Sequence, residues 1–355
     1  DVMVRTIESK KATLNGIRNR LNETEIASQL ANANLRIIDS AYVPRVPSFP
    51  NVKKTAMVSG ALFFAFLCGL PIGLNFLNDK VKTPWDIEGF INKPLLGEIL
   101  RFGKKDRENM DRVVSDGNDP GVSDTFRSIY NTIKLNDKFK ADKKIQIVTS
   151  TIPAEGKTMF SMNYGFVVSQ HGAKTLLVDC DLRKPRMEKY MNLTVDGGLV
   201  RWYDSGDAIP EGNLLGSSLG VLQLDQNTFI LPAGKASSRS TELVESDRFR
   251  DLLARLAEDY DYVIIDTPPV GVFPDALFLA EYADDVIYMT SYNRVSKKSV
   301  KHFVSQLDKT KAGVCGLVMN GRKRSIGSGQ SSYSYGYSSS YAEKYGQKYY
   351  AAKKG

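Results

Sequence analysis

The stretch from Lys144 to Thr158, KIQIVTSTIPAEGKT, constrains this chain most. A short apolar run, Ile145 to Val148, is followed by small polar residues and a proline, and Gly156-Lys157-Thr158 then opens an expected helix, MFSMNYGFVVSQ. A strand, a tight loop and a helix start in this order suit a phosphate-binding loop, because backbone N–H groups at the helix N-terminus then face an anion. The lysine ammonium can reach the outer phosphates and the threonine hydroxyl can bind Mg²⁺. The stretch therefore predicts a nucleoside triphosphate site.

This loop departs from the usual pattern, which has a glycine five residues before the glycine of GK[ST]. Thr151 holds that place here. Taken alone, the GKT sequence is therefore also compatible with an ordinary helix start that carries a lysine.

Two later apolar runs favour the nucleotide site because each ends in aspartate. Thr175 to Pro185 reads TLLVDCDLRKP, and its Asp179 and Asp181 can point to the same side of an extended chain. Asp261 to Val270 reads DYVIIDTPPV, and its run ends at Asp266. Continuous apolar runs are expected for central strands of a parallel sheet covered on both faces. Carboxylates at the ends of such strands lie where open α/β sheets bind ligands, although an isolated aspartate there is more often a helix cap or a turn residue.

The rest of this region continues the alternation of strands and helices. A helix is expected from Ser123, whose hydroxyl can cap it, to Leu135. Further expected elements are strands at 221–224 and 229–231, a helix at 240–258, a strand at 286–290, a helix at 296–308 and a strand at 314–319 that ends at Asn320. This rhythm predicts an α/β fold, a doubly wound parallel sheet of the P-loop NTPase type.

An uncharged segment from Thr55 to Asn78 is long enough for a helix to cross hydrocarbon about 30 Å thick. A buried core helix is the alternative, but such helices are rarely this long and free of charge. Lysines flank both ends, so the positive-inside rule does not settle the orientation. Triphosphates are cytosolic, so we expect the residues after 79 to lie inside the cell.

The residues before this segment give two signals. In residues 1 to about 35, Leu14, Ile17, Leu21 and Ile26 are spaced for a helical or coiled-coil stripe. Residues 41–51, AYVPRVPSFPN, carry a proline at every third position and favour an extended strut. Without an initiator methionine or a signal peptide, we expect a fragment of a longer protein.

Composition sets the remaining bounds. The 355 residues, with a net charge of +8 and an apolar fraction of 42%, allow one large domain plus appendages. The three cysteines, Cys68, Cys180 and Cys315, lack the spacing of a disulfide pair or of metal ligands, so we expect reduced thiols and no structural metal.

Beyond Arg324 the chain is rich in Ser and Gly and almost without aliphatic residues, so it cannot bury enough surface to fold. Either it is a low-complexity tail that aids assembly, or its flexible phenols accept phosphate from the ATP site. About 25 flexible residues span roughly 28 Å root-mean-square, enough to reach that site or a neighbour's. The tyrosines of this tail are Tyr333, Tyr335, Tyr337, Tyr341, Tyr345, Tyr349 and Tyr350.

Together these motifs resemble the bacterial tyrosine kinases (BY-kinases) of the exopolysaccharide co-polymerase family, which are capsular polysaccharide chain-length regulators. The resemblance is carried by SxxPxxGKT, LLVDCDLRKP, YDYVIIDTPPV, FILPAGKASSRSTELVESDRF, the tyrosine-rich end and a membrane segment preceded by AxxPxxPxxPN. It covers nearly the whole chain from about residue 35 and is similar to the fused Gram-negative arrangement. It implies the end of a periplasmic domain at 1–54, a transmembrane helix at 55–78, a cytoplasmic linker at 79–120, a P-loop kinase domain at 121–324 and a disordered tail at 325–355.

The resemblance also implies a function: an autophosphorylating protein-tyrosine kinase of the bacterial inner membrane that transfers the γ-phosphate of ATP to its own tail and regulates polysaccharide polymerisation and export. It implies that Lys157 holds the β- and γ-phosphates and that Thr158 ligates Mg²⁺. Asp179 and Asp181 would share metal positioning and activation of the phenol, and Asp266 would orient Mg²⁺ through a water. Further nucleotide contacts would come from Pro153, Ala154, Glu155, Gly156 and Met159, with Asn320 and Arg322 either touching the base or capping a strand. The partners implied are further copies of the chain, in a ring, the polysaccharide export machinery and a tyrosine phosphatase, with no nucleic acid.

Two departures from the family pattern leave other functions open. Ala154 stands where the family usually has glycine, and Asp124, Arg127 and Tyr130 stand in place of its ExxRxxR oligomerisation motif, so Asp124 and Arg127 are candidate contacts between subunits. One alternative is a partition-type ATPase, but such proteins need a second lysine where this chain has Ile152. The other alternative is a catalytically weak scaffold that binds nucleotide.

Overall fold

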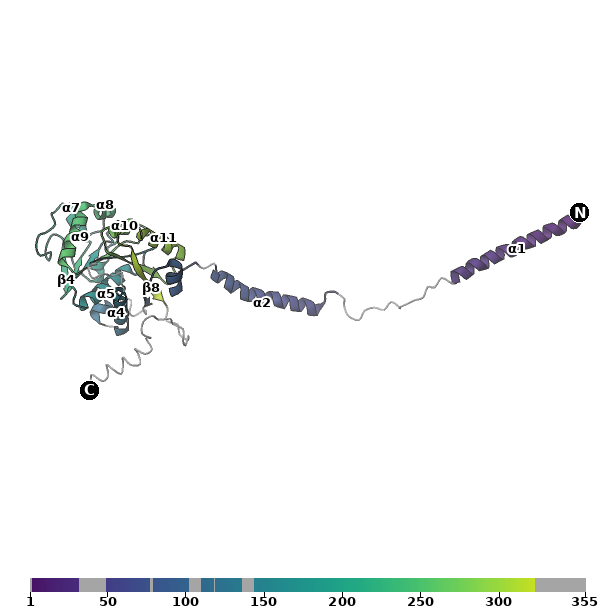
Figure 1. The fold of residues 1–355 in the computed structure, drawn as a ribbon, viewed down its shortest axis with the longest axis horizontal. Coiled ribbons are helices and arrows are strands. Elements are labelled where there is room, and N and C mark those ends of the chain that lie inside the picture. Colours follow the sequence, from purple (N-terminus) through teal and green to yellow (C-terminus); the bar gives the residue numbers. More distant parts are fainter. Residues whose placement is uncertain are drawn as a thin grey trace, which may run out of the picture. The chain divides into compact units, whose positions relative to one another are not determined.

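In the computed structural model, described for residues 2–31, 49–76, 79–101, 110–117, 119–135 and 144–322, the chain divides into two units. The first unit, Asp1–Asn75, contributes two helices, and the second unit, Phe76–Gly355, contains an α/β sheet domain (Figure 1). The seven tail tyrosines and most of the proline-rich strut lie outside the described residues.

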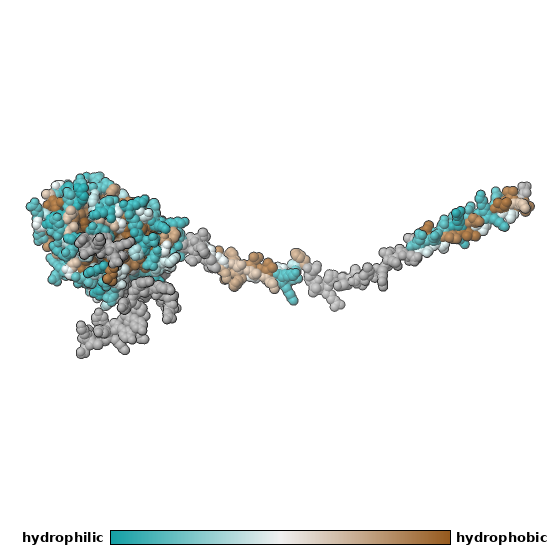
Figure 2. Space-filling view, viewed as in Figure 1, coloured by the Kyte–Doolittle hydropathy of each residue, from teal (hydrophilic) through white to brown (hydrophobic). Residues whose placement is uncertain are grey.

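Both helices of the first unit were expected from the sequence. Helix α1 (Val2–Ala31) contains the predicted stripe, whose side chains are exposed. Helix α2 (Val52–Phe76) begins three residues before the uncharged segment, and Figure 2 shows hydrophobic colours over most of its length. By length and composition, Val52–Leu70 is the one stretch of the described chain that could cross a membrane, and none of it is buried. The alternative of a core helix is therefore wrong for this structure.

The second unit is built on an eight-stranded sheet with the order β1-β8-β7-β2-β6-β3-β5-β4. The strands are β1 (Leu95–Leu100), β2 (Ile145–Ser150), β3 (Thr175–Asp179), β4 (Leu222–Asp225), β5 (Thr228–Leu231), β6 (Tyr262–Asp266), β7 (Asp285–Ser291) and β8 (Val314–Arg322). All neighbouring strands are parallel except β4 and β5. The predicted fold class, a doubly wound parallel sheet of the P-loop NTPase type, is confirmed.

Helices cover both faces of this sheet, which explains why its central strands are apolar throughout. The remaining elements are η1 (Asp86–Ile91), η2 (Met110–Arg112), α3 (Val113–Asp116), α4 (Pro120–Leu135), α5 (Lys157–Gln170), α6 (Met187–Tyr190), α7 (Leu199–Ser205), α8 (Ser240–Glu245), α9 (Asp247–Asp259), α10 (Asp275–Ala280) and α11 (Lys297–Leu307). Figure 1 shows α10 and α11 on one side of the sheet and α4 and α5 on the other. Successive residues of β6 face the two sides, because Ile264 belongs to the buried cluster that includes Phe160 of α5, whereas Ile265 belongs to the cluster that includes Leu252 of α9.

Three expectations about the second unit are wrong. Residues 79–120 were expected to be a linker, but β1 lies within them and pairs with β8, and Val81 and Ile87 are fully buried. The helix expected from Ser123 begins at Pro120, and Asp119 caps it by accepting hydrogen bonds from the N–H groups of Gly121 and Val122.

The third error concerns the single helix expected at 240–258, which is two helices. At Ser246 the backbone becomes extended, and its hydroxyl accepts a hydrogen bond from the Phe249 N–H, so a new helix begins there. A serine side chain that satisfies a free N–H group in this way is a common helix start. Cys180 and Cys315 are buried and Cys68 is exposed, and no disulfide joins these three residues.

Candidate functional site

The phosphate loop connects β2 to α5 at the centre of the sheet. Gly156 has a φ of 95°, a conformation that favours glycine, and a Cβ there would lie 2.2 Å from Nδ2 of Asn320. Thr151, which replaces the usual first glycine, is buried, and its hydroxyl lies 2.8 Å from that of Tyr288. The loop thus keeps glycine where its backbone demands it and uses a side-chain anchor where the motif deviates.

Glu155 holds this loop from inside instead of facing a nucleotide. It is fully buried; Oε1 accepts a hydrogen bond from the Ser291 N–H (2.7 Å) and Oε2 accepts one from the Ile152 N–H (2.9 Å). Burial raises the pKa of the Glu155 carboxyl, and the two N–H donors oppose that shift. The Glu155 side chain therefore shapes the loop, and the predicted nucleotide contact of this residue stays a prediction.

Two side chains, one after β7 and one in β8, form hydrogen bonds with the outer part of the loop. Arg294, which follows β7, donates a hydrogen bond of 2.6 Å to the Ala154 carbonyl, and Asn320 at the end of β8 donates one of 2.9 Å to the Glu155 carbonyl. Arg322 pairs with Glu98 of β1 at 2.5 Å. Asn320 and Arg322, expected to touch the base or cap the strand, thus both bind protein groups here.

The other loop residues divide by exposure. Pro153 and Ala154 are exposed at the tip of the loop, where a ligand can reach them. Met159 is buried in the core beneath α5, so its side chain packs under the site. The predicted nucleotide contact of Met159 stays a prediction.

Lys157, Thr158 and Asp266 form the centre of the site. Lys157 is the first residue of α5 and is only 6% exposed. Burial raises the pKa values of Asp181 and Asp266, and the charge of Lys157 opposes that rise. The Thr158 hydroxyl donates a hydrogen bond of 2.5 Å to Oδ2 of Asp266. The sequence predicts that a cation, a hydroxyl and carboxylates meet, and the structure brings Thr158 and Asp266 into direct contact.

Asp266 lies in a buried environment of low dielectric constant. Burial raises its pKa to about 7, against the opposing effects of Lys157 and Thr158. Its Oδ1 and the nearby Ser161 hydroxyl are buried without a well-formed hydrogen bond among the described residues. An unsatisfied buried carboxylate oxygen is costly in a structure that has no ligand to pair with it. It is therefore a candidate acceptor for a further group in the site.

Asp179 and Asp181 have different environments, although the sequence expected them to act together at a metal. Asp179 lies beside Asp266 in the neighbouring strand, and burial and that neighbour raise its pKa well above the usual value. Its two oxygens accept hydrogen bonds from the N–H groups of Asp181 (3.1 Å), Arg186 (3.0 Å) and Met187 (3.1 Å). Asp179 therefore shapes the loop after β3, whereas Asp181 is only partly buried and can meet a substrate.

A second buried carboxylate, missed by the sequence analysis, supports the same loop. Asp275 at the start of α10 is fully buried and accepts hydrogen bonds from the hydroxyls of Ser240 (2.8 Å) and Thr241 (2.7 Å). Arg183, two residues after Asp181, lies with Nε 3.6 Å from Asp275. This network ties the Asp181 loop to α8 and α10. Its partners are far apart in sequence, so no local pattern revealed it.

The donor set fits Mg²⁺ bound together with phosphate. The candidates are hard oxygen atoms, the Thr158 hydroxyl and Oδ1 of Asp266, which Mg²⁺ prefers. Among the described residues no group of three His, Cys, Asp or Glu side chains is arranged to hold a metal alone. The set predicted from the sequence, Thr158 with Asp179, Asp181 and Asp266 around a magnesium-bound triphosphate, stays a prediction. One or two protein ligands plus phosphate oxygens are what nucleotide-bound Mg²⁺ commonly uses.

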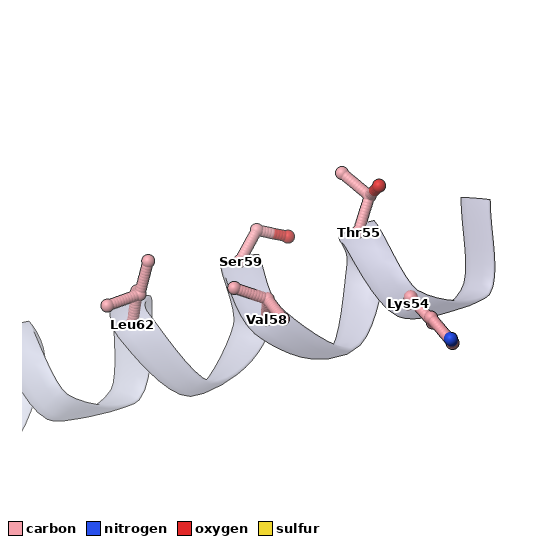
Figure 3. Close-up of a pocket in the computed structure, with 5 residues that line it drawn as sticks. All are labelled: Lys54, Thr55, Val58, Ser59 and Leu62. Atoms are coloured by element: carbon pink, nitrogen blue, oxygen red, sulfur yellow. The ribbon is translucent and has the colours of Figure 1, made fainter. Parts of the chain in front are cut away.

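Two surface features lie apart from this site. Asp124 and Arg127, expected to contact another subunit, form an ion pair of 2.9 Å with each other on α4. Figure 3 shows a shallow hollow lined by Lys54, Thr55, Val58, Ser59 and Leu62. All five residues belong to α2, so the hollow is a groove along one helix.

Comparison with known proteins gives a family model and several similar proteins. The ParA family model, described as NUBPL iron-transfer P-loop NTPase, matches residues 141–352. The chain is 32% identical over 199 residues to "Tyrosine-protein kinase CpsD" of Streptococcus pneumoniae serotype 4, covering 54% of this chain and 82% of that protein. It is 24% identical over 333 residues to "Tyrosine-protein kinase ptk" of Acinetobacter johnsonii, covering 91% of this chain and 44% of that protein.

Two further matches agree with these. The "Succinoglycan biosynthesis transport protein ExoP" of Rhizobium meliloti is 26% identical over 363 residues, covering 90% of this chain and 44% of that protein. The chain thus spans less than half the length of ptk and ExoP. The solved kinase domain of Escherichia coli tyrosine kinase ETK superposes with a TM-score of 0.62 at 20% identity, covering 73% of this chain and all of that one, which shows the same fold.

Proposed function

Because this chain belongs to the ParA family of P-loop NTPases, and within it to the bacterial tyrosine kinases of the chain-length regulator family, we propose that it is a membrane-anchored kinase that phosphorylates tyrosines of its own C-terminal segment. The phosphate donor would be ATP with Mg²⁺. The observation that carries the proposal is the meeting of Lys157, Thr158 and Asp266 at the loop that follows β2.

The residues of the site suit phosphoryl transfer, which depends mainly on alignment and on neutralising charge. When bound, Mg²⁺ would neutralise charge on the β- and γ-phosphate oxygens, and Thr158 and Asp266 are the residues that would hold it. Lys157 lies at the helix start, where its ammonium can bind the same phosphates. The grip of Glu155 and Arg294 keeps the loop backbone in place for these contacts.

Asp181 is the best placed general base. It is only partly buried; burial raises the pKa of its carboxyl, and the charge of Lys157 opposes that shift. A tyrosine hydroxyl, with an ordinary pKa of about 10, needs a nearby carboxylate to accept its proton as phosphate is transferred. Asp179 would act through Asp181, because it holds the N–H of that residue.

The acceptors would be the seven tyrosines between 333 and 350, all outside the described residues. Each phosphate adds roughly −1.5 to −2 charge, so a fully modified tail would become strongly acidic and would repel the tails of neighbouring copies. This supports a switch in which phosphorylation loosens an assembly of identical chains. The polysaccharide export and polymerisation machinery and a tyrosine phosphatase would be the further partners.

Incubating the purified chain with ATP and Mg²⁺ tests the proposal. We expect phosphate on the tail tyrosines, mapped by mass spectrometry, and its loss in Lys157→Met. Lys189→Met, which removes an exposed lysine of α6, serves as the matched control and should label normally. Labelling that persists in Lys157→Met would contradict the kinase assignment.

The same reaction separates the two other functions. Release of free phosphate without phosphotyrosine would indicate a partition-type ATPase, and nucleotide binding without either product would indicate a scaffold. Against the ATPase, the place of its second lysine is held by Ile152, whose side chain packs against the apolar core. A mixture of Lys157→Met with an active chain that lacks its tail would then distinguish transfer between chains from transfer within one, since only the former labels the inactive chain.

The proposed location is the bacterial inner membrane, with α2 as the anchor and the second unit in the cytoplasm. The apolar length of α2 supports the anchor, and the need for ATP supports the orientation. Residues before 55 would then be periplasmic. Protease treatment of sealed inverted vesicles should remove the second unit and spare residues 1–54, and the reverse pattern would overturn the orientation.

A further inference from the structure

The chain immediately after α2 is fixed to the second unit by its backbone. The Asp79 carbonyl accepts a hydrogen bond from the Lys297 N–H (2.6 Å), and Val81 exchanges two bonds, with the Val295 carbonyl (3.0 Å) and the Asn293 N–H (2.7 Å). These partners lie in the connection between β7 and α11. Three residue steps separate Phe76, the last residue of α2, from Asp79, and such a stretch spans at most about 11 Å.

This short tether has a geometric consequence, which rests on the proposed membrane anchor. If α2 crosses the bilayer, the surface around Asp79 must lie next to the lipid headgroups. The carboxylate of Asp86 accepts hydrogen bonds from the N–H groups of Lys82 (2.9 Å) and Thr83 (2.8 Å), which folds residues 82–86 into a turn. The turn keeps Trp85 close to the point where the chain leaves α2.

Trp85 is the most unusual side chain on this surface. The chain has two tryptophans; Trp202 is fully buried, whereas Trp85 is 76% exposed. The Trp85 ring lies against Gly89, where an added Cβ would approach Cε2 of the ring to 2.7 Å. One face of the ring is therefore supported by backbone and the rest is open. Tryptophan is enriched at membrane interfaces, where its ring can be apolar on one side and hydrated on the other.

Basic side chains lie against Phe90, a second aromatic residue of this segment. Lys301 donates a hydrogen bond of 2.8 Å to the Phe90 carbonyl and lies 4.8 Å from the centre of the Phe90 ring, and Lys297 lies 5.7 Å from it. Lys298 is exposed on the same helix. The juxtamembrane face is defined here as Lys82, Trp85, Phe90, Lys297, Lys298 and Lys301.

The charge of this face suits an anionic partner. Its four lysines outnumber the two carboxylates of η1, Asp86, which is paired with Lys297 at 3.2 Å, and Glu88, which is exposed. Each lysine near an anionic bilayer surface contributes about 1 kcal/mol of attraction. We propose that the juxtamembrane face rests on the anionic headgroups of the bilayer that α2 crosses, with the Trp85 ring at headgroup level.

Tryptophan fluorescence tests this contact in the full chain. The chain is placed in nanodiscs of phosphatidylcholine and phosphatidylglycerol, with or without bromine on the upper acyl chains, and the emission of a Trp85→Phe variant is subtracted to remove the Trp202 background. We expect brominated lipid to lower the Trp85 emission by about half, because a ring at headgroup level lies near the upper acyl chains. Aqueous iodide should quench it little. In the variant with Lys298→Glu and Lys301→Glu, iodide should quench the Trp85 emission more than brominated lipid does.

The possible outcomes decide between the contact and the anchor. Trp85 emission that is untouched by brominated lipid and open to iodide, in a chain that stays in the discs, overturns the juxtamembrane face alone. A chain that does not stay in the discs overturns the anchor and this face with it. Lys309→Glu with Lys311→Glu, at exposed lysines beyond α11, is the charge-matched control and should leave the quenching unchanged.

Discussion

Ala154 has the least favourable backbone in the phosphate loop. Its φ is 61°, and the other described residues with positive φ are glycines or asparagines, which tolerate this region better. An alanine Cβ in this conformation costs roughly 1–2 kcal/mol. The hydrogen bond from Arg294 to the Ala154 carbonyl helps to hold the residue there. The sequence marked this position as a departure from the family pattern, and its backbone gives the physical reason why glycine suits it.

Ala154→Gly should therefore stabilise the loop. Relief of roughly 1–2 kcal/mol of strain exceeds the roughly 0.4–1 kcal/mol that glycine costs through the unfolded chain, so we expect a net gain of up to about 1 kcal/mol. Urea unfolding of the α/β unit and ATP affinity measure it. Ala154→Val should have the opposite effect, because a branched side chain is worse at positive φ. Ala208→Gly, at an exposed residue outside the positive-φ set, is the control and should lose stability.

Asp266 should give the site its own pH dependence. Burial raises its folded pKa to about 7, above an unfolded value of about 3.9. The stability that this group contributes is therefore present below about pH 4 and is lost as the pH rises through about 7. Asp266→Asn stays neutral, so its stability relative to the ligand-free parent chain should increase between pH 5 and pH 8. The same variant should lose Mg²⁺-dependent ATP binding. Urea unfolding at each pH measures the difference. If the stabilities of the parent chain and of Asp266→Asn change with pH in parallel, the assignment is contradicted. It is also contradicted if Asp251→Asn, at an exposed position, gains stability over the parent chain with the same pH profile as Asp266→Asn.

Among the elements, the connection from β7 to α11 contacts both the chain that leaves α2 and the phosphate loop. It bonds the chain that leaves α2 through Val295 and Asn293, and it grips the phosphate loop through Arg294 and the Ser291 N–H. Parallel strands place their carboxyl ends at one edge of the sheet, so this connection lies beside the loop after β2. It is a part of the site that no motif in the sequence marked.

Removing the hydrogen bond between Arg294 and the Ala154 carbonyl should weaken nucleotide binding. Arg294→Ala loses a charged hydrogen bond, and because the side chain is exposed we expect about 1 kcal/mol, or roughly a fivefold rise in the Kd for ATP. Arg294→Lys, which keeps the charge, should recover part of the affinity. Lys309→Ala, an exposed lysine beyond α11, is the matched control for isothermal titration. An unchanged Kd in Arg294→Ala would show that the loop keeps its shape without this contact.

At the scale of the whole molecule, α2 is the proposed membrane anchor. The side chains of Val52–Leu70 are exposed, and a stretch of this length and composition suits a bilayer.

Two arginines in α2 should release the chain from membranes. Phe64→Arg with Leu67→Arg places two charges in the apolar stretch, each costing about 2.5–3.5 kcal/mol in a bilayer. We expect the chain to move from the carbonate-resistant membrane fraction to the soluble or aggregated fraction. Leu14→Arg with Leu21→Arg in α1 is the control and should leave the membrane fraction unchanged. Full membrane retention of the α2 variant would argue that another segment provides the anchor.

Several elements could be predicted from the sequence because their patterns are local. Continuous apolar runs ending at Asp179 and Asp266, the GKT start of α5 and the uncharged stretch of α2 each lie within a short window, so their patterns predicted the parallel sheet, the loop and the helix. Strand β1 was missed because it lies at the sheet edge, where half of its side chains stay partly exposed and its six residues give a weak pattern.

The role of each site residue depends on contacts between residues that are far apart in the sequence. Glu155 turns inward because the Ser291 N–H, 136 residues away, receives it, and Thr158 meets Asp266 across 108 residues. Asp179 serves its own loop although its spacing matches that of a metal ligand. Spacing can bring side chains to one edge of a sheet, but burial and hydrogen-bond partners from distant strands determine which of them remain free to meet a substrate.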